Sequence, residues 1–170
     1  MLVRNEVMDP RKPVFYEPSG KCPPASYLLG IIAVLAAAPV AAGIYALAIF
    51  YCPFIYINFL LTLGLGFAIG FIVGKAVKMG KMRSPGKASL LGIVGGLVGL
   101  YAHWVVWIFA LTDYSLLITS PSGVWSVITT AAEEGIWEIF GMRPTGIMLY
   151  LIWGIEAVMI VGVAWLTASA

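Results

Sequence analysis

Long apolar stretches separated by short polar segments dominate this chain. Residues 22–74 contain no charged side chain, and a membrane-spanning helix needs only about 20 apolar residues. This stretch therefore predicts two spans joined by a tight turn near Pro53. Two further apolar stretches follow, on either side of a more polar region. The pattern predicts an all-α polytopic membrane protein whose four spans cover about residues 26–51, 54–74, 88–111 and 146–166.

The segment from about 121 to 140 has a different pattern. Ser120 followed by Pro121 is typical of a helix start, and apolar residues recur at helical spacing until Glu133 and Glu134 interrupt them. Two adjacent carboxylates are costly deep in a bilayer. We therefore expect an amphipathic interfacial helix on the outer side, lying on the membrane or re-entering it shallowly. A fifth span is the alternative.

The first 25 residues are polar and contain five prolines. Proline is excluded from helix interiors and central strands, so we expect an extended cytoplasmic tail. No short apolar core follows the first basic residues, which argues against a cleaved export signal. Residues 26–170 predict a single four-helix transmembrane domain, disturbed in its first span by Pro39.

Composition agrees with a membrane protein. Hydrophobic residues make up 61% of the chain and charged residues only 11%, and the mean hydropathy is +0.98. Soluble domains are roughly half apolar and a quarter charged. A water-soluble fold is therefore excluded.

The basic residues are distributed asymmetrically about the predicted spans. Cytoplasmic segments of membrane proteins carry the excess of Lys and Arg, so both termini are expected in the cytoplasm. Only Arg143 would lie outside, together with the acidic residues of the 113–138 region, and Cys22 and Cys52 would face opposite sides. The basic residues then placed inside are Arg4, Arg11, Lys12, Lys21, Lys75, Lys78, Lys81, Arg83 and Lys87.

Five of these cations, Lys75, Lys78, Lys81, Arg83 and Lys87, fall in a predicted loop between the second and third spans. We interpret this loop as a topology determinant that meets anionic lipid head groups. A docking site for a cytoplasmic partner is the alternative. Nothing in the sequence favours nucleic-acid binding.

Glycines recur at four-residue spacing in the second and third spans. Small residues let helix backbones approach closely inside lipid, so we expect these two neighbouring spans to pack as a tight hairpin. A glycine-lined substrate path is the alternative. The glycines concerned are Gly66, Gly70, Gly74, Gly92, Gly95, Gly96 and Gly99.

Polar residues on three predicted spans fall at a similar depth. At 1.5 Å per residue, Glu156 lies about 15 Å and His103 about 12 Å from the outer surface. Thr62 lies at about the depth of His103, and Asn58 is one turn shallower. In one interpretation Glu156 is protonated or is hydrogen-bonded to His103, Tyr101, Thr62 or a backbone carbonyl, with His103 the first candidate, and it fixes helix packing. In the other, Glu156 and His103 form a proton or cation site, as intramembrane acids often do in transporters.

Candidate catalytic constellations are missing from the sequence. It contains a single histidine, so a haem could take only one axial ligand from one chain. The two cysteines do not fit a metal-binding spacing. We expect no enzymatic activity, no metal and no cofactor.

Residues 54–71 (FIYINFLLTLGLGFAIGF), 122–125 (SGVW) and 152–157 (IWGIEA) resemble a group of small four-span bacterial inner-membrane proteins without an established activity. The resemblance implies the four-span fold and a bacterial inner-membrane location. It also implies a cytoplasmic extension after the last span, whereas this sequence stops at Ala170.

Two functions are compatible with these patterns. The first is a non-catalytic scaffold or accessory subunit, whose partners are the lipid bilayer and either further copies of the chain or other membrane subunits. The second is a small transporter or ion or proton channel that uses Glu156 with His103. A polar cavity that reaches Glu156 would favour the second function.

Overall fold

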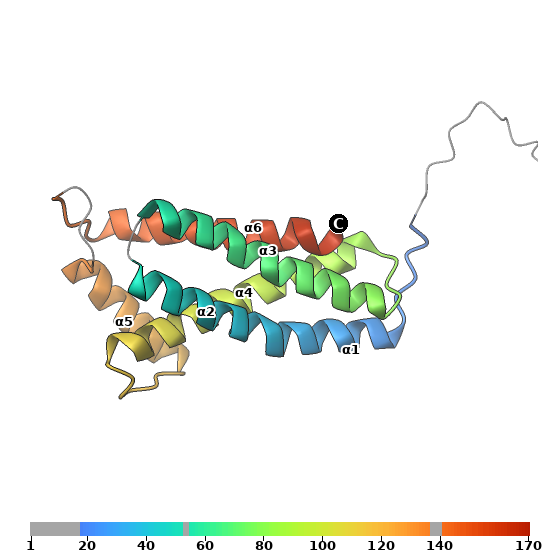
Figure 1. Cartoon of the computed structure of the whole chain (residues 1–170), viewed down its shortest axis with the longest axis horizontal. Coiled ribbons are helices and arrows are strands. Elements are labelled where there is room, and N and C mark those ends of the chain that lie inside the picture. Colours follow the sequence, from blue (N-terminus) through green and yellow to red (C-terminus); the bar gives the residue numbers. More distant parts are fainter. Residues whose placement is uncertain (1–17, 53–54, 137–140) are drawn as a thin grey trace, which may run out of the picture.

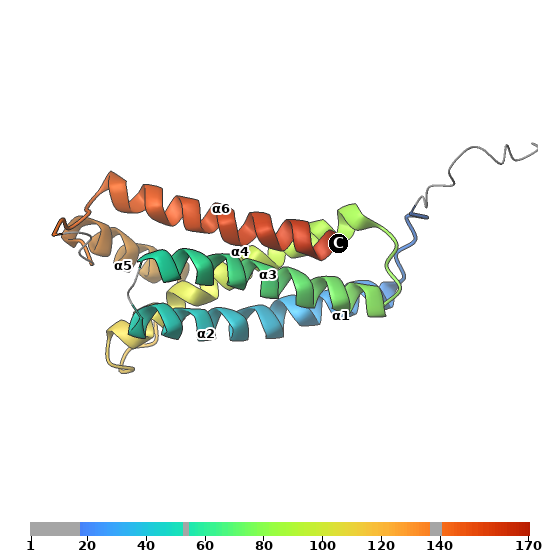
Figure 2. The same ribbon diagram turned by 45° about the horizontal axis from the view of Figure 1, so that its top comes forward.

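The computed structural model describes residues 18–52, 55–136 and 141–170, and every element in this part of the chain is a helix. Four helical segments lie side by side along an elongated bundle, and one shorter helix lies at its end (Figures 1 and 2). The four are long and apolar enough to cross a membrane. The predicted all-α fold with four spans is therefore confirmed, and the chain is an integral membrane protein. The elements are α1 (Pro24–Ile32), η1 (Ala33–Ala37), α2 (Ala38–Tyr51), α3 (Ile55–Met79), α4 (Pro85–Leu111), α5 (Pro121–Glu134) and α6 (Ile147–Ser169).

The first span consists of α1, η1 and α2 in direct succession. Pro39 lies in the first turn of α2, directly after the π-helical turn η1. Proline has no N–H and its ring clashes with the carbonyl four residues earlier. The wider π turn accommodates this defect without ending the helix, so the expected disturbance at Pro39 is a local change of winding.

The segment between the second and third spans is shorter than expected. Residues 75–87 were predicted as a basic loop, but Lys75 and Lys78 belong to the last turns of α3 and Lys87 to the first turn of α4. Long basic side chains can extend from a helix end toward water, which explains why these charges did not end the helices. Only residues 80–84 connect α3 to α4.

An extended N-terminal segment lies against this connection. The Gly20 N–H donates to the Arg83 carbonyl over 3.0 Å, and the Arg83 N–H donates to the Lys21 carbonyl over 2.8 Å. The segment is thereby fixed at the same end of the bundle as the α3–α4 connection. The rest of the predicted tail, residues 1–17, lies outside the described residues.

The shorter helix α5 begins as predicted and ends earlier. The Ser120 hydroxyl accepts the Gly123 N–H over 3.3 Å, with Pro121 in the first turn. The helix ends at Glu134, whereas we expected it to continue to about residue 140. Gly135 terminates α5 with a φ of +71°, a conformation that glycine adopts without steric cost. Residues 137–140 lie outside the described residues.

The glycine contacts differ from the prediction. A β-carbon added to Gly70 of α3 or Gly92 of α4 would lie 2.6 Å or 2.5 Å from the Ala164 carbonyl oxygen of α6. Only glycine permits so close a backbone approach. The prediction that the glycines join the second and third spans to each other is therefore wrong for most of them. The glycines whose β-carbon would meet α6 are Gly66, Gly70, Gly74, Gly92 and Gly96.

The remaining two glycines do support the predicted hairpin. An added β-carbon at Gly95 or Gly99 would approach the Ile69 side chain of α3, at 3.0 Å and 2.5 Å. The glycines of α4 therefore serve two neighbours, α3 and α6. We call the contact of α6 with the glycines of α3 and α4 the glycine seam, and Ala164 lies at its centre.

Candidate functional site

Two hydroxyl groups meet inside the bundle at the predicted polar depth. The Tyr45 hydroxyl of α2 lies 2.8 Å from the Thr62 hydroxyl of α3, and both side chains are buried. Thr62 also donates to the Asn58 carbonyl over 2.7 Å. A threonine hydroxyl has one proton, so Tyr45 donates to Thr62. The Tyr45 oxygen can then accept a hydrogen bond from a further donor.

His103 of α4 packs against the same tyrosine. The imidazole ring lies 4.9 Å from the Tyr45 ring and 5.2 Å from the Trp104 ring, measured between centroids. Among the described residues neither His103 nitrogen has a hydrogen-bond partner, although the side chain is only 3% exposed. The predicted hydrogen bond between Glu156 and His103 is therefore wrong. Burial of an imidazole without a partner has an energetic cost.

Glu156 lies on α6 and is only partly buried. No hydrogen bond connects its carboxyl group to another described residue. The helices of one chain therefore leave part of this acid uncovered at membrane depth.

Of the four predicted polar residues, Thr62 and His103 both contact Tyr45 and Asn58 lies one turn from Thr62 on α3, whereas Glu156 makes no hydrogen bond with them. We call Tyr45, Thr62, Asn58 and His103 the polar slab. Thr62 and Asn58 hydrogen-bond within α3, while the Asn58 side-chain oxygen has no partner among the described residues. The described residues contain no group of three or more His, Cys, Asp or Glu that could hold a metal ion. The arrangement offers hydrogen-bond acceptors and one acid.

Tyr45 is the member of this cluster that sequence reasoning missed. It lies six residues before the end of α2 at Tyr51, which places it about 9 Å from that end at 1.5 Å per residue. The same depth argument that selected His103 and Thr62 would have selected Tyr45. Its phenol group connects α2 to α3 and α4.

An aromatic cluster lies between this polar slab and the α5 end. Trp104 of α4 contacts Trp153 of α6 with ring centroids 5.0 Å apart, and Trp125 of α5 stacks on Tyr150 of α6 at 6.4 Å. Aromatic pairs in these geometries stabilise a fold by more than the burial of their apolar area alone accounts for. The rings therefore attach α5 to the bundle.

The opposite end of the bundle is basic. The cationic side chains that the structure describes here are all exposed, and Lys87 lies over the Tyr27 ring at 6.0 Å. Cys22 is at this end and Cys52 is at the other end of the first span; both are free thiols. The described cations of the basic end are Lys21, Lys75, Lys78, Lys81, Arg83 and Lys87.

Comparison with known proteins finds no family model that matches the chain, and no similar curated protein or solved structure. No relative therefore assigns a role to the polar slab, the aromatic cluster or the basic end.

Proposed function

We propose that the chain is a non-catalytic subunit of a membrane assembly, and that its neighbour packs against the flank of α6 that carries Glu156. The simplest neighbour is a second copy of the chain. The supporting observation is that Glu156 is partly exposed near the middle of a membrane span and has no hydrogen bond to another described residue. Lipid offers a carboxyl group no partner, and a charged one costs at least about 2.5 kcal/mol there.

Covalent cross-linking in membranes tests the position of this contact. In a chain without Cys22 and Cys52, Met159→Cys places a thiol on the Glu156 flank of α6, one turn along. We expect it to form a disulfide-linked dimer under mild oxidation. Val158→Cys, on the outward face of the same helix at 73% exposure, is the matched control and should not. Equal cross-linking of both variants, or of neither, would contradict the proposed homo-oligomeric contact.

A small proton or ion transporter is the second candidate, and the polar slab favours it. Tyr45, Thr62 and His103 come from three helices and contact one another through Tyr45, and Glu156 is carried by a fourth helix. Glu156→Gln distinguishes the two functions because an amide keeps the size and hydrogen bonding but cannot carry a proton. For a subunit contact, assembly in detergent is unchanged. For a transporter, proton or cation flux into liposomes is lost although assembly persists.

For localisation we propose the bacterial inner membrane, with both termini and the basic end in the cytoplasm. The support is the separation of charge, because the described acids Asp113, Glu133 and Glu134 lie near the α5 end of the bundle. An impermeant thiol reagent applied to intact cells should label Cys52 and leave Cys22 unlabelled until the cells are opened. Labelling of Cys22 from outside would reverse the orientation.

A further inference from the structure

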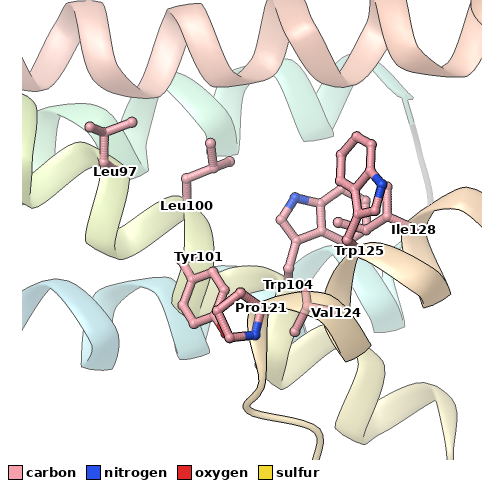
Figure 3. Close-up of a pocket in the computed structure, with 8 residues that line it drawn as sticks. All are labelled: Leu97, Leu100, Tyr101, Trp104, Pro121, Val124, Trp125 and Ile128. Carbon is pink, nitrogen blue, oxygen red and sulfur yellow. The ribbon is translucent and has the colours of Figure 1, made fainter.

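An apolar groove separates α4 from α5. It has a volume of about 300 Å³ and is lined by four residues of each helix. Figure 3 shows the rings of Trp104 and Trp125 gathered at one end, while Leu97 and Leu100 extend from α4 at the other. The only side-chain polar groups on these walls are the Tyr101 hydroxyl and the two indole N–H groups. The lining residues are Leu97, Leu100, Tyr101, Trp104, Pro121, Val124, Trp125 and Ile128.

The groove lies at the depth of the hydrocarbon core. Tyr101 donates its hydroxyl proton to the Thr119 carbonyl over 2.7 Å, so the start of α5 lies beside Tyr101. α4 continues for ten residues from Tyr101 to Leu111, which is about 15 Å at 1.5 Å per residue. The chain between α4 and α5 therefore returns along α4. Leu97, fourteen residues before the end of α4, lies about 21 Å along it, near the middle of a roughly 40 Å helix.

The surface around the groove faces lipid. Leu97 is 53% exposed on α4, and Leu116 and Leu117, in the segment before α5, are also exposed. The groove continues this surface inward. Its volume of about 300 Å³ is too small for a helix, because a cylinder of about 10 Å diameter occupies roughly 800 Å³ over about 10 Å of length. A flexible chain enters such a space, whereas a helix of another subunit does not.

We propose that this groove binds one acyl chain of a membrane phospholipid, with the end of the chain near Leu97 and the Trp104 and Trp125 rings along the part nearer the membrane surface. The length of the groove along α4, from Leu97 to Trp104, is about 10 Å, which fits within one leaflet of a hydrocarbon core about 30 Å thick. Tryptophan rings, which have an apolar body and a polar N–H, are enriched toward the interface between membrane and water. The phospholipid would wedge between α4 and α5 and hold their separation.

Native mass spectrometry of protein purified in mild detergent tests the proposal. The wild-type chain should retain one phospholipid per protomer at detergent concentrations that strip the remaining lipid. Leu97→Trp fills the deep end of the groove and should abolish this retention. Leu90→Trp introduces the same side chain on the same helix, at a residue that is 60% exposed and does not line the groove, and should retain the lipid. Retention by Leu97→Trp, or no retained phospholipid on the wild-type chain, would overturn the proposal.

A second measurement detects the lipid without a substitution that blocks the groove. A phospholipid with a brominated acyl chain, titrated into the wild-type chain in detergent, should quench tryptophan fluorescence with a component that saturates near one lipid per protomer. The double variant Trp104→Phe/Trp125→Phe removes both groove indoles and should lose that component, while Trp165→Phe, on the exposed face of α6, should keep it. A component that persists in the double variant would exclude the groove as its source. A different outcome is a wild-type chain that is dimeric, retains no lipid, and becomes monomeric on Leu97→Trp. That result would overturn the proposal and show that a second copy occupies the groove.

Discussion

Gly70→Ala tests the glycine seam with the smallest possible perturbation, one methyl group. The added β-carbon would lie 2.6 Å from the Ala164 carbonyl oxygen and would also collide with the Thr167 hydroxyl. Ordinary contact begins near 3.4 Å, so α6 would have to move away by roughly 1 Å. Displacements of this kind in a packed core cost typically about 1–3 kcal/mol.

Gly64→Ala is the matched control on the same helix, because an added β-carbon there meets nothing within 4 Å. Both substitutions gain the same helix propensity, about 0.5–1 kcal/mol, which cancels when the two variants are compared. The remaining difference of about 1–3 kcal/mol corresponds to roughly 2–12 °C in Tm for a chain of this size. This difference in Tm can be measured by heating each variant in detergent and recording the loss of its monodisperse size-exclusion peak. Equal Tm values for the two variants would show that α6 does not contact Gly70.

Two further changes test individual hydrogen bonds. Tyr45→Phe removes the proton donated to Thr62 and should lower the free energy of unfolding by about 0.6 kcal/mol, the average for such bonds within membranes; a Tm equal to that of the wild type would argue against the contact. The pKa of Tyr114 is raised by its 2.7 Å hydrogen bond to Tyr51. That bond therefore stabilises the fold at neutral pH and is lost as the pH rises through the raised pKa, above 10. Hydrogen–deuterium exchange is too fast at this pH, so limited proteolysis of the 112–120 segment is the measurement, with Tyr51→Phe as the variant that should show no pH step.

The four spans could be predicted because each is a long apolar stretch, and length together with apolar composition indicates that a helix can cross a bilayer. Their ends were less predictable. Lys75 and Lys78 looked like loop residues, yet both lie in α3, because a lysine at a helix end keeps its charge in water while its backbone remains helical. The start of α5 was predictable because Ser120 and Pro121 form a local signal that depends on no distant contact.

The lateral contacts could not be predicted in the same way. Four-residue spacing identifies the small face of α3, but it does not identify the helix that this face meets, which is α6 rather than α4 at Gly70. Depth gave Glu156 and His103 the same level without giving the direction of either side chain around its helix. His103 faces Tyr45 of α2, whereas Glu156 lies at the edge of α6. The sequence therefore predicted the depth of each side chain in the membrane, but not its direction around the helix axis.

The glycine seam also has a consequence for the order in which the protein is made. The glycines of α3 and α4 leave the ribosome before α6 does, so their smooth backbone surfaces enter the membrane without the helix that covers them. Until α6 is inserted, the glycines that Ala164 covers in the finished fold have no helix against them. We therefore expect α6 to be the last span to pack, and a chain interrupted in the connection before Ile147 should accept α6 supplied as a separate peptide.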